Sequence, residues 1–145
     1  MKNNTPLVSV VVPSYNAIAY ISGFMKSLLA TTYPRMEIII VDDGSIDGTL
    51  EFLQRLSLKD PRVKTIKTLK RLGLTRSRNI ALQCANGEYI AFSETDTEFD
   101  KNWLTESIRE LERDKTLGAV TGKVFDINKR KIIQAKGIKI IPHVS

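Results

Sequence analysis

Two carboxylates stand one residue apart in a short acidic segment, at Glu94 and Asp96. They directly follow the run Tyr89–Phe92, whose aromatic and β-branched residues are typical of a strand. Ligands of open α/β sheets bind in the loops just past the carboxyl ends of strands. Mg²⁺ and Mn²⁺ prefer oxygen ligands, and Mg²⁺ is often held by one or two carboxylates plus substrate phosphates, so the pair predicts a metal–diphosphate site. An ordinary solvated acidic loop has the same pattern, and that alternative stays open.

Two other predicted strands also end in polar residues. The apolar run Leu7–Val12 leads into Pro13–Asn16, and the run Glu37–Val41 leads into Asp42–Ser45. Because the carboxyl ends of parallel strands meet at one edge of a sheet, we expect the three polar segments to converge. Their convergence carries more weight than any one of the segments alone.

Four side chains near this edge are candidates for holding a nucleotide. Tyr15 could stack on a nucleobase, and Asp43 could accept a hydrogen bond from a base N–H or a ribose hydroxyl. Asp96 could hold the metal that bridges a diphosphate, and Arg78 could donate to phosphates or to the base. The alternatives are a packed Tyr15 with a solvated hydroxyl, and a simple turn with a helix cap at residues 42–45. For a further arginine, Arg76, a solvated basic face is the preferred interpretation.

The elements that position these residues alternate along the chain. Strands are predicted at 7–12, 37–41, 63–66, 89–92 and 117–124, and amphipathic helices between them and at 103–111. Ser45 or Asp47 is expected to cap the second helix, and the less apolar third strand is expected near an edge. The fold class is therefore α/β, with three α/β/α layers, right-handed βαβ units and a mostly parallel twisted sheet of Rossmann-like topology.

After residue 124 the pattern changes. Lys129–Lys131 resembles a hairpin turn, and Ile132–Ile133 and Ile138–Ile141 resemble short strands. We expect a single nucleotide-binding domain over 1–145, with an α/β core at 1–124 and a β-hairpin tail at 125–145.

The composition limits the classes of function. The chain has 145 residues, 42% hydrophobic and 26% charged, a normal globular balance. The net charge of +6 suits a phosphate-bearing ligand, nucleic acid or an anionic membrane without choosing among them. A zinc site is not expected, since Cys84 and His143 are the only residues of their types. No run of about 18 apolar residues and no signal-peptide apolar region is found, which favours a cytoplasmic location.

The chain resembles the amino-terminal half of inverting nucleotide-sugar glycosyltransferases with the GT-A fold, in the family that includes bacterial polysaccharide glycosyltransferases and cellulose and chitin synthases. The matching segments cover about residues 7 to 100 in the family's order and spacing, and as a set they are highly specific. They are Val8–Asn16, Glu37–Thr49, Gly73 with Arg78-Asn79, and Gly87–Phe92.

The resemblance implies a role for each site residue. Pro13 and Tyr15 would line the nucleobase pocket, Asp43 would hydrogen-bond the base, and Arg78 would assist base or phosphate binding. In the family's Asp-x-Asp motif, Asp96 matches the metal-binding position. Glu94 replaces the first aspartate, which usually meets the ribose side of the donor. Arg71 stands where an asparagine is common.

The implied reaction transfers a sugar, with inversion, from a UDP- or dTDP-sugar to a saccharide or lipid-linked acceptor hydroxyl, in bacterial cell-surface polysaccharide or glycolipid synthesis. Mg²⁺ or Mn²⁺ would neutralise the leaving diphosphate, and a carboxylate would act as base. No residue up to Ser145 matches that base, so we name no catalytic residue and expect the acceptor-binding half to be missing. A place at the inner face of the membrane, a homodimer or a partner chain would be compatible with this family.

Three other functions are alternatives for this sequence. The first is a truncated or non-catalytic nucleotide-sugar-binding module that works with a partner chain. The second is a nucleic-acid-binding domain. The sequence has no aromatic-rich basic platform of the kind that binds single strands, so no nucleic acid partner is expected. The third is a dinucleotide oxidoreductase, which the missing Gly-x-Gly-x-x-Gly after the first strand disfavours.

Overall fold

The computed structural model describes residues 5–122, 124–125 and 133–135 of the chain. The chain divides into two compact units, the first made of Met1–Ala30 and Pro34–Phe99, and the second of Thr31–Tyr33 and Asp100–Ser145. All the candidate site residues belong to the first unit. The expected single domain with a core at 1–124 and a tail at 125–145 stays a prediction.

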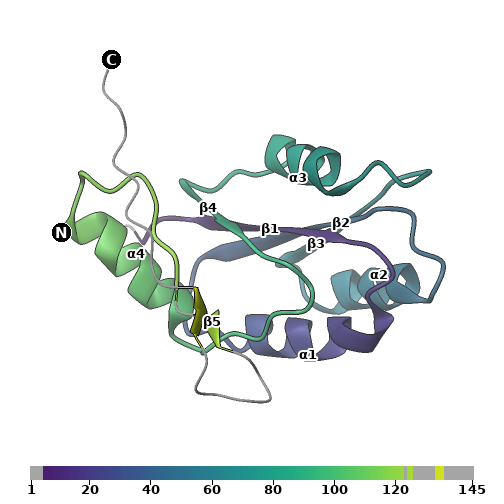
Figure 1. Cartoon of the computed structure of the whole chain (residues 1–145), viewed down its shortest axis with the longest axis horizontal. Helices are drawn as coiled ribbons and strands as arrows, with labels where there is room; N and C mark the ends of the chain where they lie inside the picture. Colours follow the sequence, from purple (N-terminus) through teal and green to yellow (C-terminus); the bar gives the residue numbers. More distant parts are fainter. Residues whose placement is uncertain (1–4, 123, 126–132, 136–145) are drawn as a thin grey trace. The chain divides into compact units, whose positions relative to one another are not determined.

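Four parallel strands form the sheet of the first unit, in the order β3-β2-β1-β4 (Figure 1). The parallel register places Val10 beside Ile38 on one side and beside Ala91 on the other. Every residue of the two central strands is buried, as expected where a parallel sheet is covered on both faces. The prediction that the third strand lies at an edge is confirmed. The strands are β1 (Val8–Ser14), β2 (Met36–Asp42), β3 (Val63–Lys67) and β4 (Tyr89–Phe92).

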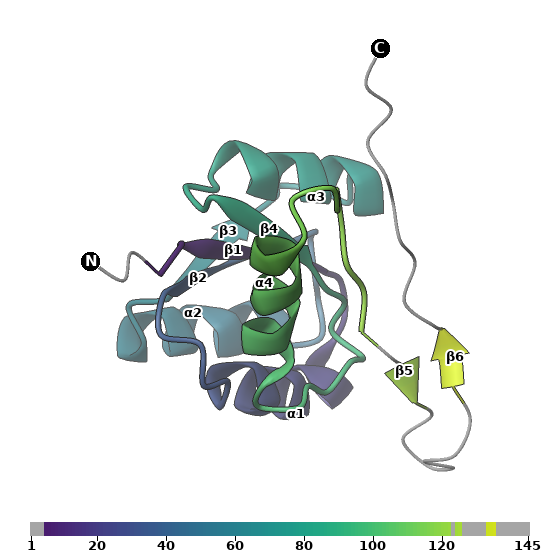
Figure 2. The same cartoon turned by 90° about the vertical axis from the view of Figure 1, so that its left-hand side faces the viewer.

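Three helices cover the two faces of this sheet. α1 (Ile18–Leu29) and α2 (Thr49–Lys59) lie on one face, and α3 (Leu74–Gln83) lies on the other (Figures 1 and 2). Beneath α3, Ala81 packs with Val11 and Ile39 in a fully buried apolar cluster. The predicted three-layer α/β/α class is therefore confirmed. Among the described residues, no helix is long and apolar enough to span a bilayer.

The second unit contains one helix and a short antiparallel pair of strands. α4 spans Trp103–Arg113, and β5 (Val124–Phe125) pairs antiparallel with β6 (Ile133–Ala135). The pairing is the one that the predicted hairpin requires. The predicted turn at Lys129–Lys131 and the predicted strand at Ile138–Ile141 lie outside the described residues.

The predicted strand at Leu117–Val124 is wrong. Residues 117–122 contain only an isolated bridge at Ala119, and the strand that follows is just two residues long. Gly118 and Gly122 interrupt this segment. Glycine weakens a strand because it loses more backbone entropy than other residues when the strand forms, and because it has no side chain to pack.

A carboxylate ties the strands together at the amino-terminal edge of the sheet, opposite the candidate site. Glu37 on β2 accepts hydrogen bonds from the Ser9 hydroxyl of β1 at 2.7 Å and from the Asn86 backbone N–H at 2.7 Å. It also forms an ion pair with Lys64 of β3 at 2.7 Å. Burial alone would raise the pKa of Glu37, but these hydrogen bonds outweigh it and lower the pKa from 4.5 to about 2.

The turn before β4 lies directly against the same edge. The Gly87 N–H donates to the Ser9 hydroxyl at 2.8 Å, and a Cβ at position 87 would lie 2.5 Å from the Ser9 nitrogen. Only glycine permits so close an approach of two backbones. The turn glycine ahead of the acidic segment is therefore explained by its packing on β1.

Candidate nucleotide site

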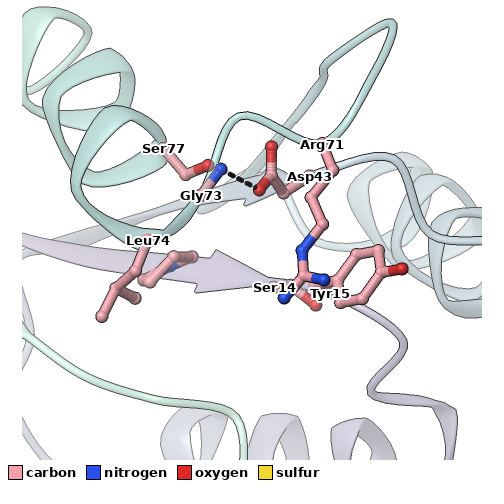
Figure 3. Close-up of a pocket in the computed structure, with 8 residues that line it drawn as sticks. Ser14, Tyr15, Asp43, Arg71, Gly73, Leu74 and Ser77 are labelled. Carbon is pink, nitrogen blue, oxygen red and sulfur yellow. Dashed lines mark hydrogen bonds between the residues drawn. The ribbon is translucent and has the colours of Figure 1, made fainter.

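Two adjoining pockets lie where β1, β2 and β4 end. The first pocket has a volume of about 200 Å³. It is lined by Tyr15 from the loop after β1, by Asp43 from the loop after β2, and by Arg71 from the loop that leads into α3 (Figure 3). The second, of about 280 Å³, is lined by Tyr15 together with Glu94 and Asp96. Pro13, Tyr15 and Leu74 line both pockets. The predicted convergence of three strand ends on one edge is thus present in the structure.

Hydrogen bonds between the first two strand-end loops hold Tyr15 in place. The Asn16 N–H donates to the Ser45 hydroxyl at 2.9 Å, and the Ile46 N–H donates to Asn16 Oδ1 at 3.0 Å. Asn16 has a φ of 47°, a left-handed conformation that asparagine tolerates better than most residues. The loop after β1 is therefore fixed by the loop after β2, which lies about 30 residues further along the chain.

The expected cap of the second helix is confirmed at Asp47. Gly48, with a φ of 96°, occupies the N-cap position of α2, and the carboxylate of the residue before it accepts from the helix. Asp47 Oδ1 accepts hydrogen bonds from the first N–H of α2, at Thr49, at 3.0 Å and from the Thr49 hydroxyl at 2.6 Å. Asp47 Oδ2 accepts from the first N–H of α1, at Ile18, at 3.0 Å. The sequence pattern did not reveal this second role, which arises because the two helices are neighbours in space.

Asp43 is buried, with 4% of its surface exposed, and its carboxylate accepts three hydrogen bonds. The donors are the Leu72 N–H at 2.8 Å, the Gly73 N–H at 2.7 Å and the Thr68 hydroxyl at 3.2 Å. Burial would raise the pKa of Asp43, but the bonds from the two backbone N–H groups and the hydroxyls outweigh it and lower the pKa. The carboxylate is therefore ionised at neutral pH, and it organises the loop that leads into α3.

This arrangement refines the predicted role of Asp43. A carboxylate offers about four acceptor positions, and the Leu72 N–H, the Gly73 N–H and the Thr68 hydroxyl occupy three of them. A hydrogen bond from the Ser77 hydroxyl also contributes to the lowered pKa of Asp43, and Asp43 lines the first pocket. A hydrogen bond from Asp43 to a base stays a prediction.

Arg71 is a site residue whose contacts the sequence did not predict, since the sequence shows only that it stands where an asparagine is common. Its guanidinium lies over the Tyr15 ring, 4.2 Å from the ring centroid (Figure 3). The two residues are far apart in the sequence, and no spacing rule relates them. The sequence signal for this contact is an arginine two residues before a turn glycine, at Arg71 and Gly73. That pattern is too common to predict a contact by itself.

Arg78 and Glu94 contact each other. Arg78 Nη2 lies 2.8 Å from Glu94 Oε1, and the Arg78 guanidinium lies 5.9 Å from the centroid of the Phe92 ring. Arg78 Nε is buried and has no partner among the described residues. Because the Glu94 side chain is 56% exposed, the pair adds little to stability. The predicted contacts of Arg78 with phosphate or base, and of Glu94 with ribose, stay predictions.

Asp96 is exposed and lines the second pocket with Glu94 and Tyr15. The described part of the chain holds no group of three or more side chains that could coordinate a metal by themselves. Two carboxylates beside an open pocket fit a hard cation that takes its remaining ligands from a substrate diphosphate. The residues are therefore compatible with Mg²⁺ or Mn²⁺ bound together with a nucleotide.

Comparison with protein families relates this geometry to known proteins. The model of the family described as glycosyl transferase family 2 matches residues 9–140. An uncharacterized glycosyltransferase of Haemophilus influenzae is 38% identical over 117 residues, which are 81% of this chain and 36% of that protein. The UDP-Glc:alpha-D-GlcNAc-diphosphoundecaprenol beta-1,3-glucosyltransferase WfaP of Escherichia coli is 36% identical over 75% of this chain and 43% of its own length. The chain thus spans less than half the length of these relatives.

A solved structure gives the same result. The mannosyltransferase PcManGT of Pyrobaculum calidifontis, in complex with GDP-Man and Mn²⁺, superposes with a TM-score of 0.76 and 26% identity. The similarity covers 88% of this chain and 38% of that enzyme. The parallel sheet of this chain therefore has the GT-A fold of glycosyltransferases.

Proposed function

Because the chain belongs to glycosyl transferase family 2, we propose that its three strand ends bind the nucleotide of a nucleotide-sugar donor whose sugar is transferred to an acceptor hydroxyl. The observation that carries the proposal is the meeting of Tyr15, Asp43 and Asp96 around two adjoining pockets. Uridine or thymidine diphosphate sugars are the proposed donors. The proposed acceptor is a saccharide or a lipid-linked sugar of a bacterial surface polysaccharide, and the proposed location is the cytoplasm, at the inner face of the membrane.

The base and the diphosphate occupy different pockets in this proposal. The base enters the first pocket, between Pro13 and Tyr15 on one side and Asp43 on the other, where the ionised carboxylate accepts a hydrogen bond from it. The diphosphate lies toward the second pocket, which Glu94 lines, and Arg78, the ion-pair partner of Glu94, would donate to the phosphates. Glu94 holds Arg78 through its Oε1 atom and leaves its second oxygen available to the donor.

Asp96 would hold the divalent cation, and the donor diphosphate would supply further oxygen ligands. When bound, such a cation neutralises the charge that grows on the departing diphosphate. Asp96, whose carboxylate is exposed beside the second pocket, would supply an oxygen ligand to that cation. The general base that deprotonates the acceptor hydroxyl is assigned to no residue of this chain. Transfer with inversion at the anomeric carbon is part of the proposal.

A thermal-shift assay tests nucleotide and metal binding together. UDP and Mn²⁺ at 100 times the dissociation constant should stabilise the chain by about 2.7 kcal/mol, which raises Tm by several degrees. Asp96→Ala should lose the metal-dependent part of this rise and keep the metal-independent part. Glu51→Ala removes an exposed carboxylate on α2 that lines neither pocket, and should keep both parts. If Asp96→Ala keeps the full rise with Mn²⁺, the metal assignment is wrong.

A further inference from the structure

Residues 61–87, which contain β3, the loop after it and α3, are a strongly basic part of the chain. They include seven lysines and arginines and no aspartate or glutamate, so they carry more positive charge than the net +6 of the whole chain. Three of the seven form ion pairs with acidic residues outside this stretch, at Arg62, Lys64 and Arg78. Lys67 and Lys70 are exposed, and neither forms an ion pair with any residue that the structure describes. Their charges are therefore available to an anionic partner.

Leu69, between these two lysines, is an apolar side chain that the fold holds in solvent. Its exposed fraction is 98%. The residue before it is anchored to the sheet, since the Thr68 N–H donates to the Asp42 carbonyl oxygen at 2.9 Å. The Thr68 hydroxyl oxygen also lies 2.8 Å from the Lys70 carbonyl oxygen, so the chain turns tightly around Leu69. Leu69 is thus the tip of a fixed turn.

A second exposed apolar side chain, Ile46, stands on the loop after β2, with an exposed fraction of 89%. This loop touches the loop after β3, because a Cβ at Gly44 would lie 3.2 Å from the Arg71 nitrogen and 3.2 Å from the Lys70 carbonyl carbon. Both loops project from the same end of the sheet, where the two pockets also lie (Figure 1). The exposed residues of these two loops that line neither pocket form what we call the basic–apolar patch: Ile46, Lys67, Leu69 and Lys70.

Apolar tips beside unpaired lysines match the surface of an anionic bilayer. Ammonium groups are attracted to acidic headgroups, and leucine and isoleucine side chains enter the boundary between headgroups and acyl chains. A nucleic acid would pair with the lysines but would leave both apolar tips in water. The acidic neighbour of Ile46, Asp47, directs its two carboxylate oxygens to the starts of α1 and α2. The chemistry of the patch therefore favours a lipid surface.

We propose that the basic–apolar patch docks this chain on a bilayer that contains acidic phospholipids. In the docked state, Leu69 and Ile46 enter the headgroup–acyl boundary, and the two lysines lie among the headgroups. Because the patch and the two pockets share one end of the sheet, docking brings the pockets to the membrane surface, where a lipid-linked acceptor would be met. The identity of that acceptor rests on the proposed function, whereas binding to the bilayer does not.

Co-sedimentation of the full chain with lipid vesicles tests this docking without any nucleotide. The unaltered chain should bind vesicles of mixed phosphatidylglycerol and phosphatidylcholine, should not bind vesicles of phosphatidylcholine alone, and should bind less as salt is added. The double variant Lys67→Ala with Lys70→Ala should bind about 25-fold more weakly, since each basic residue near an acidic surface contributes a factor of about five. Leu69→Ser should bind at least about tenfold more weakly, because it removes the apolar tip.

The chain offers a matched control at the other end of the sheet. Leu58 is 89% exposed, and it precedes the exposed Lys59 at the end of α2, where β3 has not yet begun. Leu58→Ser and Lys59→Ala therefore remove groups of the same kinds from outside the patch, and both should bind acidic vesicles as the unaltered chain does. Thermal unfolding followed by circular dichroism should give the same Tm for all these variants, since every substituted side chain is exposed.

Four results would overturn the docking. The first is that the unaltered chain does not bind acidic vesicles. The second is that Leu69→Ser binds them fully, which would show a purely electrostatic surface of the kind that suits a nucleic acid. The third is that Leu58→Ser loses as much binding as Leu69→Ser. The fourth is that analytical ultracentrifugation without vesicles finds a dimer that Leu69→Ser dissociates, which would make the patch a contact between two copies. A chain that binds vesicles but shows no thermal shift with UDP would refute the proposed function and leave the docking in place.

Discussion

Glu37 offers a direct test of how the sheet is held together, because Glu37→Gln removes one charge and little volume. The carboxylate joins β1, β2, β3 and the turn before β4 through Ser9, Lys64 and Asn86. Glutamine keeps one oxygen acceptor but replaces the other with an NH₂ group that faces the Lys64 ammonium or the Asn86 donors. The substitution should therefore destabilise the fold without creating a cavity.

The size of the effect follows from the pKa. The side chain of Glu37 is only 11% exposed, and its pKa is lowered from 4.5 to about 2. A depression of this size corresponds to about 3 kcal/mol of stability in favour of the ionised form. Because the pKa in the folded state lies below that in the unfolded state, this stability is fully present above about pH 4.5 and is lost as the pH falls toward about 2. We expect Glu37→Gln to lower the free energy of unfolding by about 3 kcal/mol at pH 7.

Urea denaturation followed by circular dichroism, repeated between pH 7 and pH 3, measures this effect. The difference between the unaltered chain and Glu37→Gln should shrink steadily below pH 4.5. Glu51→Gln, at an exposed position on α2, should change the free energy of unfolding by less than about 0.5 kcal/mol. If the free energies of unfolding of Glu37→Gln and the unaltered chain differ little at pH 7, or if their difference does not change with pH, the hydrogen bonds to Glu37 are not the cause of its low pKa.

Two other substitutions test the strand-end loops. Asp43→Ala should weaken UDP binding both with and without Mn²⁺, because it removes an acceptor in the pocket and releases the loop that carries Arg71. Calorimetry measures the affinity, and an affinity equal to that of the unaltered chain would argue against the contact between Asp43 and the base. Asp47→Ala should lower the free energy of unfolding by about 1–2 kcal/mol, because it removes the acceptor for the first N–H of α1. Urea denaturation measures this loss, and a stability equal to that of the unaltered chain would contradict the role of Asp47 as a cap for α1.

Much of the fold is determined by local patterns in the sequence. Continuous β-branched runs, such as that around Val10 and that around Ile39, predict strands buried on both faces, and both strands are fully buried. Alternation of such runs with helical periodicity predicts the three layers and the common edge of the polar segments. The strand predicted at 117–124 is absent, which shows the limit of local patterns. Gly118 and Gly122 interrupt this segment, so its local pattern is too weak to determine its conformation.

The contacts within the site were decided by the tertiary structure. The sequence placed Tyr15, Asp43 and Asp96 at one edge, but it did not reveal that Arg71 lies on Tyr15 or that Asp43 binds the loop at residues 72–73. The reason is physical. Hydrophobic periodicity reports which face of an element is buried, and this follows from neighbours in sequence. Which donor meets which acceptor depends on where loops from distant elements come to lie, and that is settled only when the sheet and its helices have packed together.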